Sequence, residues 1–305
     1  MKKIAVLSHL SAILVTLAIS PFSACAAEKE AGYVYTIIDN EATVTGFEGE
    51  PVYIEIPEVI DGCRVTEIRD NSFYECGSLK HITLPDTIEK IGHHAFYACY
   101  SLESVTIPDS VKEIGMGCFS GCEKLTSAAL SDNISRIPDS CFRSCTSLTS
   151  FEIGDNITET GDFSFSGCTS LKTVSIGSSV KTIGDCSFYM CGLKSVYIPP
   201  TVEFLGVCSV GYTPSEEGAV PIEGYTILGK KKSAAAKYAN ENSLTFENAE
   251  DSVHAFAIQR ISGQRIAVPS VFIITGCIML FALLMSFFSR KRKRRNVRRI
   301  KSTSK

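Results

Sequence analysis

Apolar residues return along the central half of the chain at a fixed interval of 23 positions. Within each interval a leucine is followed three positions later by an aliphatic residue and two positions after that by another, as in Leu79, Ile82 and Leu84. Residues two apart lie on the same face of a β-strand, so Ile82 and Leu84 point inward and Thr83 points to solvent. The pattern predicts one short, half-buried strand in every interval.

Two further columns follow the same interval and belong to the predicted core. Phenylalanine occupies one column and cysteine, three residues later, the other: Phe73, Phe96, Phe119, Phe142, Phe165 and Phe188, with Cys76, Cys99, Cys122, Cys145, Cys168 and Cys191. A unit of 23 residues cannot bury its own apolar side, so successive units must stack to form a continuous core. We expect a β-rich repeat solenoid of about seven such units, here called rungs, each advancing about 4.8 Å.

The repeat L-x-x-L-x-L-P-x-x-(I/V)-x-x-I-G-x-x-x-F-x-x-C resembles the BspA-like leucine-rich repeat of bacterial surface proteins. The resemblance covers about 54–211, half of the chain. "YVYTIIDNEATVTGF" (33–47) looks like the family's N-terminal β-hairpin cap, and "GYTILGKKKSAAAKYANENSLTF" (224–246) looks like its closing strand, helix and strand. The middle rungs depart from the motif where the proline after the strand is replaced, at Ser131, Gly154 and Gly177.

Both ends of the chain carry membrane-related signals. Two lysines, an apolar run and the small residues Ala24-Cys25-Ala26 indicate a cleaved signal peptide, while Cys25 leaves lipidation open as an alternative. Near the other end, 268–289 is long and apolar enough for a membrane helix, and ten Lys or Arg follow it directly. By the positive-inside rule the tail lies in the cytoplasm and the repeats lie outside the cell.

These signals divide the chain into seven segments. We predict a signal peptide (1–27), an N-terminal cap (28–53), the solenoid (54–211) and a C-terminal cap (212–247). A polar stalk (248–267), one transmembrane helix (268–289) and a basic cytoplasmic tail (290–305) follow.

The formal net charge of −3 hides an uneven distribution. Without Lys2, Lys3 and the ten cations of the tail, 18 basic residues stand against 33 acidic ones. An acidic surface repels phosphate backbones, so we expect no nucleic-acid partner outside the cell.

Most of the thirteen cysteines are best interpreted as packing residues. Six occupy one repeat column, and stacked side chains run parallel to one another, although neighbouring rungs bring Cα atoms within disulfide range. A buried thiol behaves as a small apolar group. Cys186 and Cys208 differ, because each falls two residues after a rung-closing glycine on consecutive rungs. They are the candidate disulfide.

Catalytic chemistry has little support in the sequence. We find no nucleophile, phosphate-loop or paired-carboxylate motif, and we expect no cofactor. His93 and His94 lie together in a turn and leave a metal or enzymatic site open as an alternative.

The solvent-facing positions vary between rungs while the buried ones stay constant, which is typical of an extended binding face. Tyr74, Tyr97, Tyr100, Tyr189 and Tyr197 are expected to be exposed, as interface tyrosines often are. The candidate ligand surface is Tyr74, Lys80, His81, Thr83, Tyr97, Thr106, Glu152, Tyr189 and Tyr197. The resemblance implies adhesion, with proteins or glycoproteins of a host or neighbouring cell as partners. A structural role in the cell envelope is the alternative.

Overall fold

The computed structural model describes residues 4–7, 28–30 and 32–250. The predicted stalk from residue 251 onward, the membrane helix, the basic tail and Cys25 lie outside the described residues. Among those that are described, no helix is long and apolar enough to cross a membrane. Two short strands, β1 (Ile4–Leu7) and β2 (Glu28–Glu30), pair with each other, and β1 also pairs with β3.

The predicted N-terminal hairpin follows β1 and β2 in the chain. β3 (Tyr33–Ile38) and β4 (Glu41–Phe47) pair antiparallel. Asp39 and Asn40 connect them with φ of 52° and 65°, as a two-residue hairpin turn of the mirror-image type requires. β4 then pairs in parallel with β7 (Cys63–Ile68), so the hairpin covers the first rung of the solenoid. β6 (Val59–Ile60) pairs antiparallel with β7.

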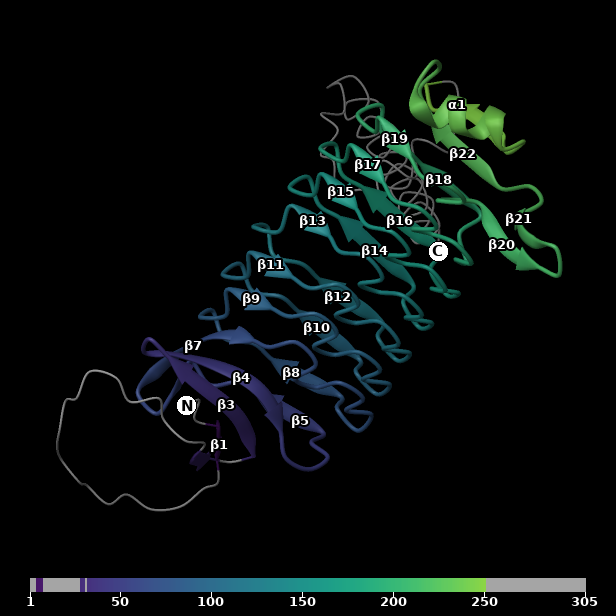
Figure 1. Cartoon of the computed structure of the whole chain (residues 1–305). Coiled ribbons are helices and arrows are strands. Elements are labelled where there is room, and N and C mark those ends of the chain that lie inside the picture. Colours follow the sequence, from purple (N-terminus) through teal and green to yellow (C-terminus); the bar gives the residue numbers. More distant parts are fainter. Residues whose placement is uncertain (1–3, 8–27, 31, 251–305) are drawn as a thin grey trace, which may run out of the picture. The chain divides into compact units, whose positions relative to one another are not determined.

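Two columns of short strands run along the solenoid (Figure 1). The first column contains β5 (Tyr53–Glu55), β8 (His81–Thr83), β10 (Ser104–Thr106), β12 (Ser127–Ala129), β14 (Ser150–Ile153), β16 (Thr173–Ile176), β18 (Ser195–Tyr197), β22 (Thr226–Gly229) and β23 (Thr245–Asn248). The second contains β7, β9 (Lys90–Ile91), β11 (Glu113–Ile114), β13 (Arg136–Ile137), β15 (Glu159–Thr160), β17 (Thr182–Ile183) and β19 (Phe204–Leu205). Paired residues lie 23 apart in most rungs, for example Ser104 and Ser127.

The solenoid has about nine turns rather than the predicted seven rungs. The difference arises at its C-terminal end. β22 pairs in parallel with β18, and β23 pairs in parallel with β22, so the closing strands extend the first column. The 23-residue spacing is lost here, because Val196 pairs with Ile227 and Ile227 with Phe246. Sequence periodicity alone therefore stops short of the last two turns.

The C-terminal cap also contains one helix and one hairpin. Helix α1 (Ala234–Glu241) connects β22 to β23 and buries Ala235, Tyr238 and Ala239. Its N-cap is Ser233, whose hydroxyl accepts a hydrogen bond from the Ala236 amide. The hairpin of β20 (Tyr212–Ser215) and β21 (Gly218–Pro221) projects beyond the neighbouring coils in Figure 1.

The core is built from the repeated apolar columns. The six phenylalanines stack ring on ring with centroids 5.1–5.6 Å apart, and all are buried. Full burial of each ring stabilises the fold by about 2 kcal/mol. The cysteine column also links rungs, since the Cys99 thiol donates to the Phe73 carbonyl oxygen at 3.2 Å. Four later cysteines do the same: Cys122, Cys145, Cys168 and Cys191.

Proline 138 marks an interruption in the second column. The rung-closing glycine normally donates its N–H to the preceding rung, as Gly115 does to the Ile91 carbonyl oxygen at 2.8 Å. Pro138 occupies that position in the next rung and has no N–H to donate. β11 and β13 accordingly belong to different sheets. In the first column β12 and β14 are also separate, beside half-buried Ala128, which stands where other rungs carry a larger side chain.

Candidate recognition surface

We use the name strand face for the solvent-facing side of the first column, where alternation leaves small polar side chains outward. β8, β10 and β12 and the turns that follow them enclose an open groove of about 660 Å³. The polar residues that line it are His81, Thr83, Asp86, Ser104, Thr106 and Asp109. Its floor consists of the inward-pointing strand residues, including Ile82 and Val105, which are almost completely buried.

The groove carries negative charge that the described part of the chain leaves uncompensated. Asp86 and Asp109 are exposed and form no ion pair with any described residue. No lysine or arginine lines the groove. His81 lies 3.8 Å from the Glu103 carboxylate, which adds another acid at the edge.

An aromatic ring borders the same groove. Tyr53 on β5 pairs in register with His81 on β8, and their rings stack at 5.3 Å with an angle of 15°. Tyr53 is 70% exposed, the most exposed tyrosine of the described chain. The groove therefore combines hydroxyls, carboxylates and one accessible aromatic face.

A smaller hollow lies farther along the strand face. It measures about 230 Å³ and spans the gap between β12 and β14. Ser127, Ser150, Glu152, Thr173 and Ser175 contribute its polar lining. The small Ala128 side chain below it explains the hollow, since Phe151 in the next rung instead packs against Phe142 and Phe165.

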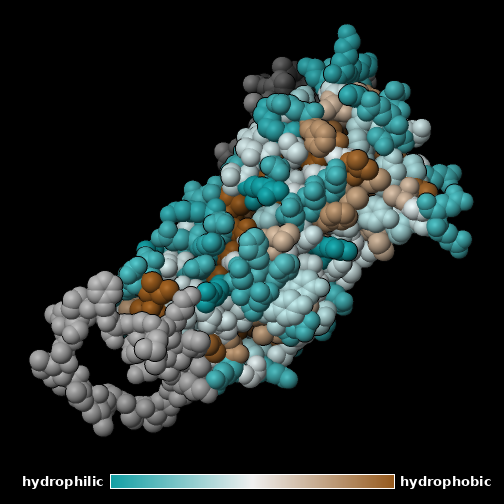
Figure 2. All heavy atoms as spheres, in the orientation of Figure 1, coloured by the Kyte–Doolittle hydropathy of each residue, from teal (hydrophilic) through white to brown (hydrophobic). Residues whose placement is uncertain are grey.

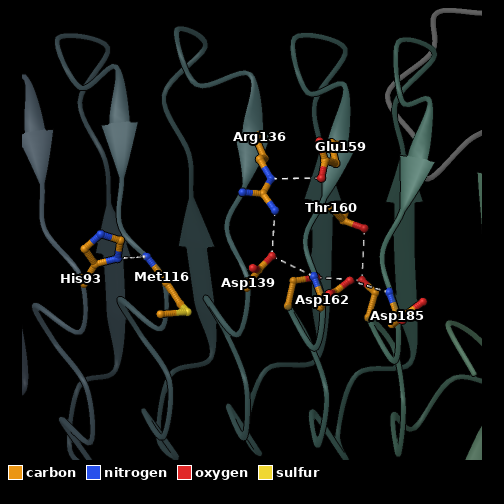
Figure 3. Close-up of polar contacts among 10 residues, drawn as sticks. His93, Met116, Arg136, Asp139, Glu159, Thr160, Asp162 and Asp185 are labelled. Atoms are coloured by element: carbon orange, nitrogen blue, oxygen red, sulfur yellow. Dashed lines mark hydrogen bonds and ion pairs between the residues drawn. The ribbon is translucent and has the colours of Figure 1, made fainter. Parts of the chain in front are cut away.

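The second column differs because its charges pair across rungs. Lys112 contacts Glu89 at 2.8 Å. Arg136 contacts both Glu159 at 3.1 Å and Asp139 at 2.8 Å (Figure 3). The Lys112 ammonium, supported by a more distant Arg64, lowers the pKa of Glu89. Further pairs join Arg64 to Glu89, Lys90 to Glu113 and Lys181 to Glu203. These pairs are exposed, so solvent screens them and they add little to stability.

Side chains that directly follow the rung-closing glycines accept hydrogen bonds from the backbone of the next rung, and several of them are carboxylates. Asp139 accepts a hydrogen bond from the Asp162 amide at 3.0 Å, and Asp162 accepts one from the Asp185 amide at 2.8 Å (Figure 3). His93 holds the same position in an earlier rung, where its Nδ1 accepts from the Met116 amide at 2.9 Å. His94 meets Tyr97 edge-on at 5.6 Å. Throughout the described segments, no cluster of three or more His, Cys, Asp or Glu could hold a metal ion.

The predicted ligand residues fall on two different sides of the rungs. His81, Thr83, Thr106, Glu152 and Tyr197 lie on the strand face, and Lys80 precedes β8 outside the groove lining. The remaining three, Tyr74, Tyr97 and Tyr189, lie in the turns after the phenylalanine column.

The expectation that all five tyrosines are exposed is wrong for three of them. Tyr74 and Tyr100 are 45% and 47% exposed, but Tyr97, Tyr189 and Tyr197 are only half-exposed or less. Tyr97 is covered because its ring stacks on Tyr74 at 4.9 Å. Figure 2 shows that hydrophobic residues on the face in view occur in separate small patches among hydrophilic ones.

Each rung also contains two positions in the left-handed backbone region, which the sequence does not reveal. One lies two residues after the closing glycine and is occupied by Asn71, His94, Gly117, Ser140, Phe163, Cys186 and Cys208. The other follows the phenylalanine by two and is occupied by Glu75, Ala98, Gly121, Ser144, Gly167 and Met190. Because most of these residues are not glycine, composition gives no consistent signal of the conformation.

Cys186 and Cys208 occupy equivalent places on consecutive rungs. Both have φ of 51°, and the Cys186 amide donates to the Val207 carbonyl oxygen at 2.8 Å. Both are partly exposed, whereas Cys118 and Cys141, another pair on neighbouring rungs, are completely buried. Burial and the neighbouring Cys208 thiol raise the pKa of Cys186. All eleven cysteines in the described part of the chain are free thiols here, so a disulfide between these two stays a prediction.

Comparison with known proteins agrees with the geometry. Residues 66–194 match six copies of the BspA type leucine rich repeat region. A leucine rich cell surface protein from Faecalibacterium prausnitzii A2-165 is 26% identical, with a TM-score of 0.55 over 70% of this chain and 71% of that one. A leucine-rich repeat protein from Eubacterium ventriosum ATCC 27560 is 20% identical, with a TM-score of 0.53 over 60% of this chain and 50% of that one, which supports the fold alone.

No curated protein matches the sequence. The six repeat copies, the stacked rungs and the solved neighbours nevertheless agree on one classification. The chain carries a BspA-type leucine-rich repeat region, and its structural neighbours are leucine-rich repeat proteins of bacteria.

Proposed function

We propose that the protein is displayed at the cell surface and recognises extracellular proteins or glycoproteins through its strand face, without catalysis. The observation that carries this proposal is the contrast between the two columns. Charges of the second column pair across rungs, whereas the strand face holds an open groove with uncompensated carboxylates. Carboxylates that no cation of the described chain neutralises are available to a ligand.

Display outside the cell is supported by the predicted signal peptide at 1–27 and the predicted membrane helix at 268–289. The neighbour from F. prausnitzii is itself described as a cell surface protein. Together these observations favour an anchored solenoid whose repeats face the surroundings and whose basic tail lies in the cytoplasm.

Adhesion to a host matrix, a mucosal surface or a neighbouring cell is the role that fits such a solenoid. Outward residues change from rung to rung, for example from Thr106 to Glu152 to Tyr197, around a constant core. A repeat scaffold of this kind provides an extended surface for a protein partner. The exposed rings of Tyr74 and Tyr100 in the turns offer a second contact area.

Cells that express the full-length chain test the proposal when they are exposed to immobilised host and bacterial surface extracts. We expect capture that is lost in Thr106→Trp, which fills the groove, and retained in Lys124→Trp. Lys124 is exposed and outside the lining of either hollow. Capture that survives Thr106→Trp unchanged, or no capture from any extract, would instead favour a structural role in the envelope.

A further inference from the structure

The charges around the groove indicate what kind of segment it receives. Asp86 and Asp109 line it, Glu103 lies at its edge, and neither lysine nor arginine is among its lining residues. Asp132 and Asp155 continue the same column on the next two rungs and are exposed. Neighbouring rungs are about 4.8 Å apart, so these aspartates repel one another unless a cation lies between them.

Five cations of the solenoid are engaged elsewhere. Arg64, Lys90, Lys112, Arg136 and Lys181 all contact acids of the second column or its flanking turns. Between residues 32 and 250 the chain has 30 acidic and 15 basic residues. The described chain therefore has too few cations to neutralise the strand face, and a partner can supply them.

We propose that the groove formed by β8, β10 and β12 binds an extended peptide segment of the partner that carries lysine or arginine side chains. This inference rests on the proposed function and names the chemistry of the same surface. Thr83, Ser104 and Thr106 offer hydroxyls to the polar groups of the segment, while Asp86 and Asp109 accept hydrogen bonds from its cationic heads.

Tyr53 adds a second attraction for a cation. Its ring stacks on His81 on one side and is 70% exposed, so a guanidinium or ammonium group can approach the free face. Contacts of this type act within about 6 Å of the ring centroid. Anionic ligands, by contrast, meet only repulsion from the three carboxylates at this site.

Direct binding of synthetic peptides to the purified full-length chain in a neutral detergent tests the inference. The probe is a fluorescent decapeptide of alternating lysine and serine, and its uncharged counterpart alternates glutamine and serine. The variant is Asp86→Asn with Asp109→Asn. Asparagine keeps the oxygen with which Asp109 accepts from the Asp132 amide, so the fold is preserved. Unchanged thermal unfolding checks this.

The control variant, Glu216→Gln with Glu217→Gln, removes the same charge from the exposed tip of the β20–β21 hairpin. We expect the lysine peptide to bind more tightly than the glutamine peptide. Its affinity should fall about fivefold for each aspartate removed and stay within twofold in the control.

Three results would overturn the inference. The first is equal affinity for the lysine and the glutamine peptide. The second is equal loss of affinity in both double variants, which would indicate only the long-range electrostatic field of the protein. The third is full competition by free spermine at equal charge concentration, which would indicate a site for small polyamines. None of these bears on capture of surface extracts, whose loss in Thr106→Trp tests the proposed function separately.

Discussion

Replacement of one rung-closing glycine by alanine should separate two rungs. A Cβ atom at Gly184 would lie 2.6 Å from the Gly161 carbonyl carbon and 2.7 Å from the Asp162 amide nitrogen. Both are backbone atoms of the preceding rung and cannot move aside as a side chain can. Real Cβ contacts are essentially never below 3.0 Å, and nine in ten are longer than 3.4 Å, so the rungs must move apart by several tenths of an ångström.

The cost follows from the hydrogen bonds that such a displacement weakens. The Gly184 amide donates to the Thr160 carbonyl oxygen at 2.8 Å, the Asp185 amide donates to Asp162, and the Phe163 amide donates to the Asp185 carbonyl oxygen. At about 1 kcal/mol for each, Gly184→Ala should lower the free energy of unfolding by about 3 kcal/mol. For a domain of this size the expected fall in Tm is about 6–12 °C.

Thermal unfolding monitored by circular dichroism measures the effect, with Gly77→Ala as the matched control. Gly77 has ordinary φ, and its nearest neighbour would be a Tyr100 ring carbon at 3.5 Å, so its replacement should leave Tm within about 1 °C. If the two variants unfold at the same temperature, the close approach of the rungs at Gly184 does not limit stability, and the reasoning is wrong.

Three further predictions concern the turns and the thiols. Met190 has φ of 59° where two other rungs carry glycine, so Met190→Gly should raise the free energy of unfolding by about 0.5–1 kcal/mol; a lower midpoint in urea would contradict the strain. Burial raises the pKa of Cys76 to about 11, which keeps the thiol protonated at neutral pH. Its alkylation by iodoacetamide in the native protein should therefore rise about tenfold per pH unit between pH 8 and 10, and a flat profile would refute the shift. Oxidised glutathione should link Cys186 to Cys208 and release two molecules of reduced glutathione. Closure of a 22-residue loop would stabilise the fold by about 3 kcal/mol, and peptide mapping that finds both thiols free after this treatment would exclude the bond.

The periodic part of the fold could be predicted because every rung repeats the same physical requirement. An inward phenylalanine stacks on its copy 23 residues away, and a strand pairs with its copy at the same spacing. The hairpin from Tyr33 was predictable as well, since Asp39 and Asn40 suit its turn. Periodicity carries no information beyond Cys208, however, where Ile227 and Phe246 pair at irregular spacings. The resemblance predicted the closing strands as part of a cap, but their pairing as two further turns was missed for that reason.

Local conformation was less predictable than stacking. Ser140, Phe163 and Met190 adopt left-handed φ because the neighbouring rungs hold their backbone in place, and none of these residues prefers that region. The interruption at Pro138 had a visible signal, because a proline stands where the other rungs use a glycine N–H. The separation of β11 from β13 could be inferred only once it is known that the glycine N–H donates to the preceding rung.

The candidate site shows how the repeat itself separates structural from available charges. Residues 23 apart are neighbours in space, so a charge followed at that spacing by its opposite is compensated within the fold, as Lys90 is by Glu113 and Arg136 by Glu159. Asp86, by contrast, is followed by Asp109, then by Asp132 and Asp155, four like charges in succession. Asp109 and Asp155 each accept a hydrogen bond from the amide 23 residues on. None of the four aspartates forms an ion pair with a described residue, so the column still costs electrostatic energy. We infer that its benefit comes from outside the solenoid, which is why the groove beside this column, and not the more highly charged second column, is the surface to test first.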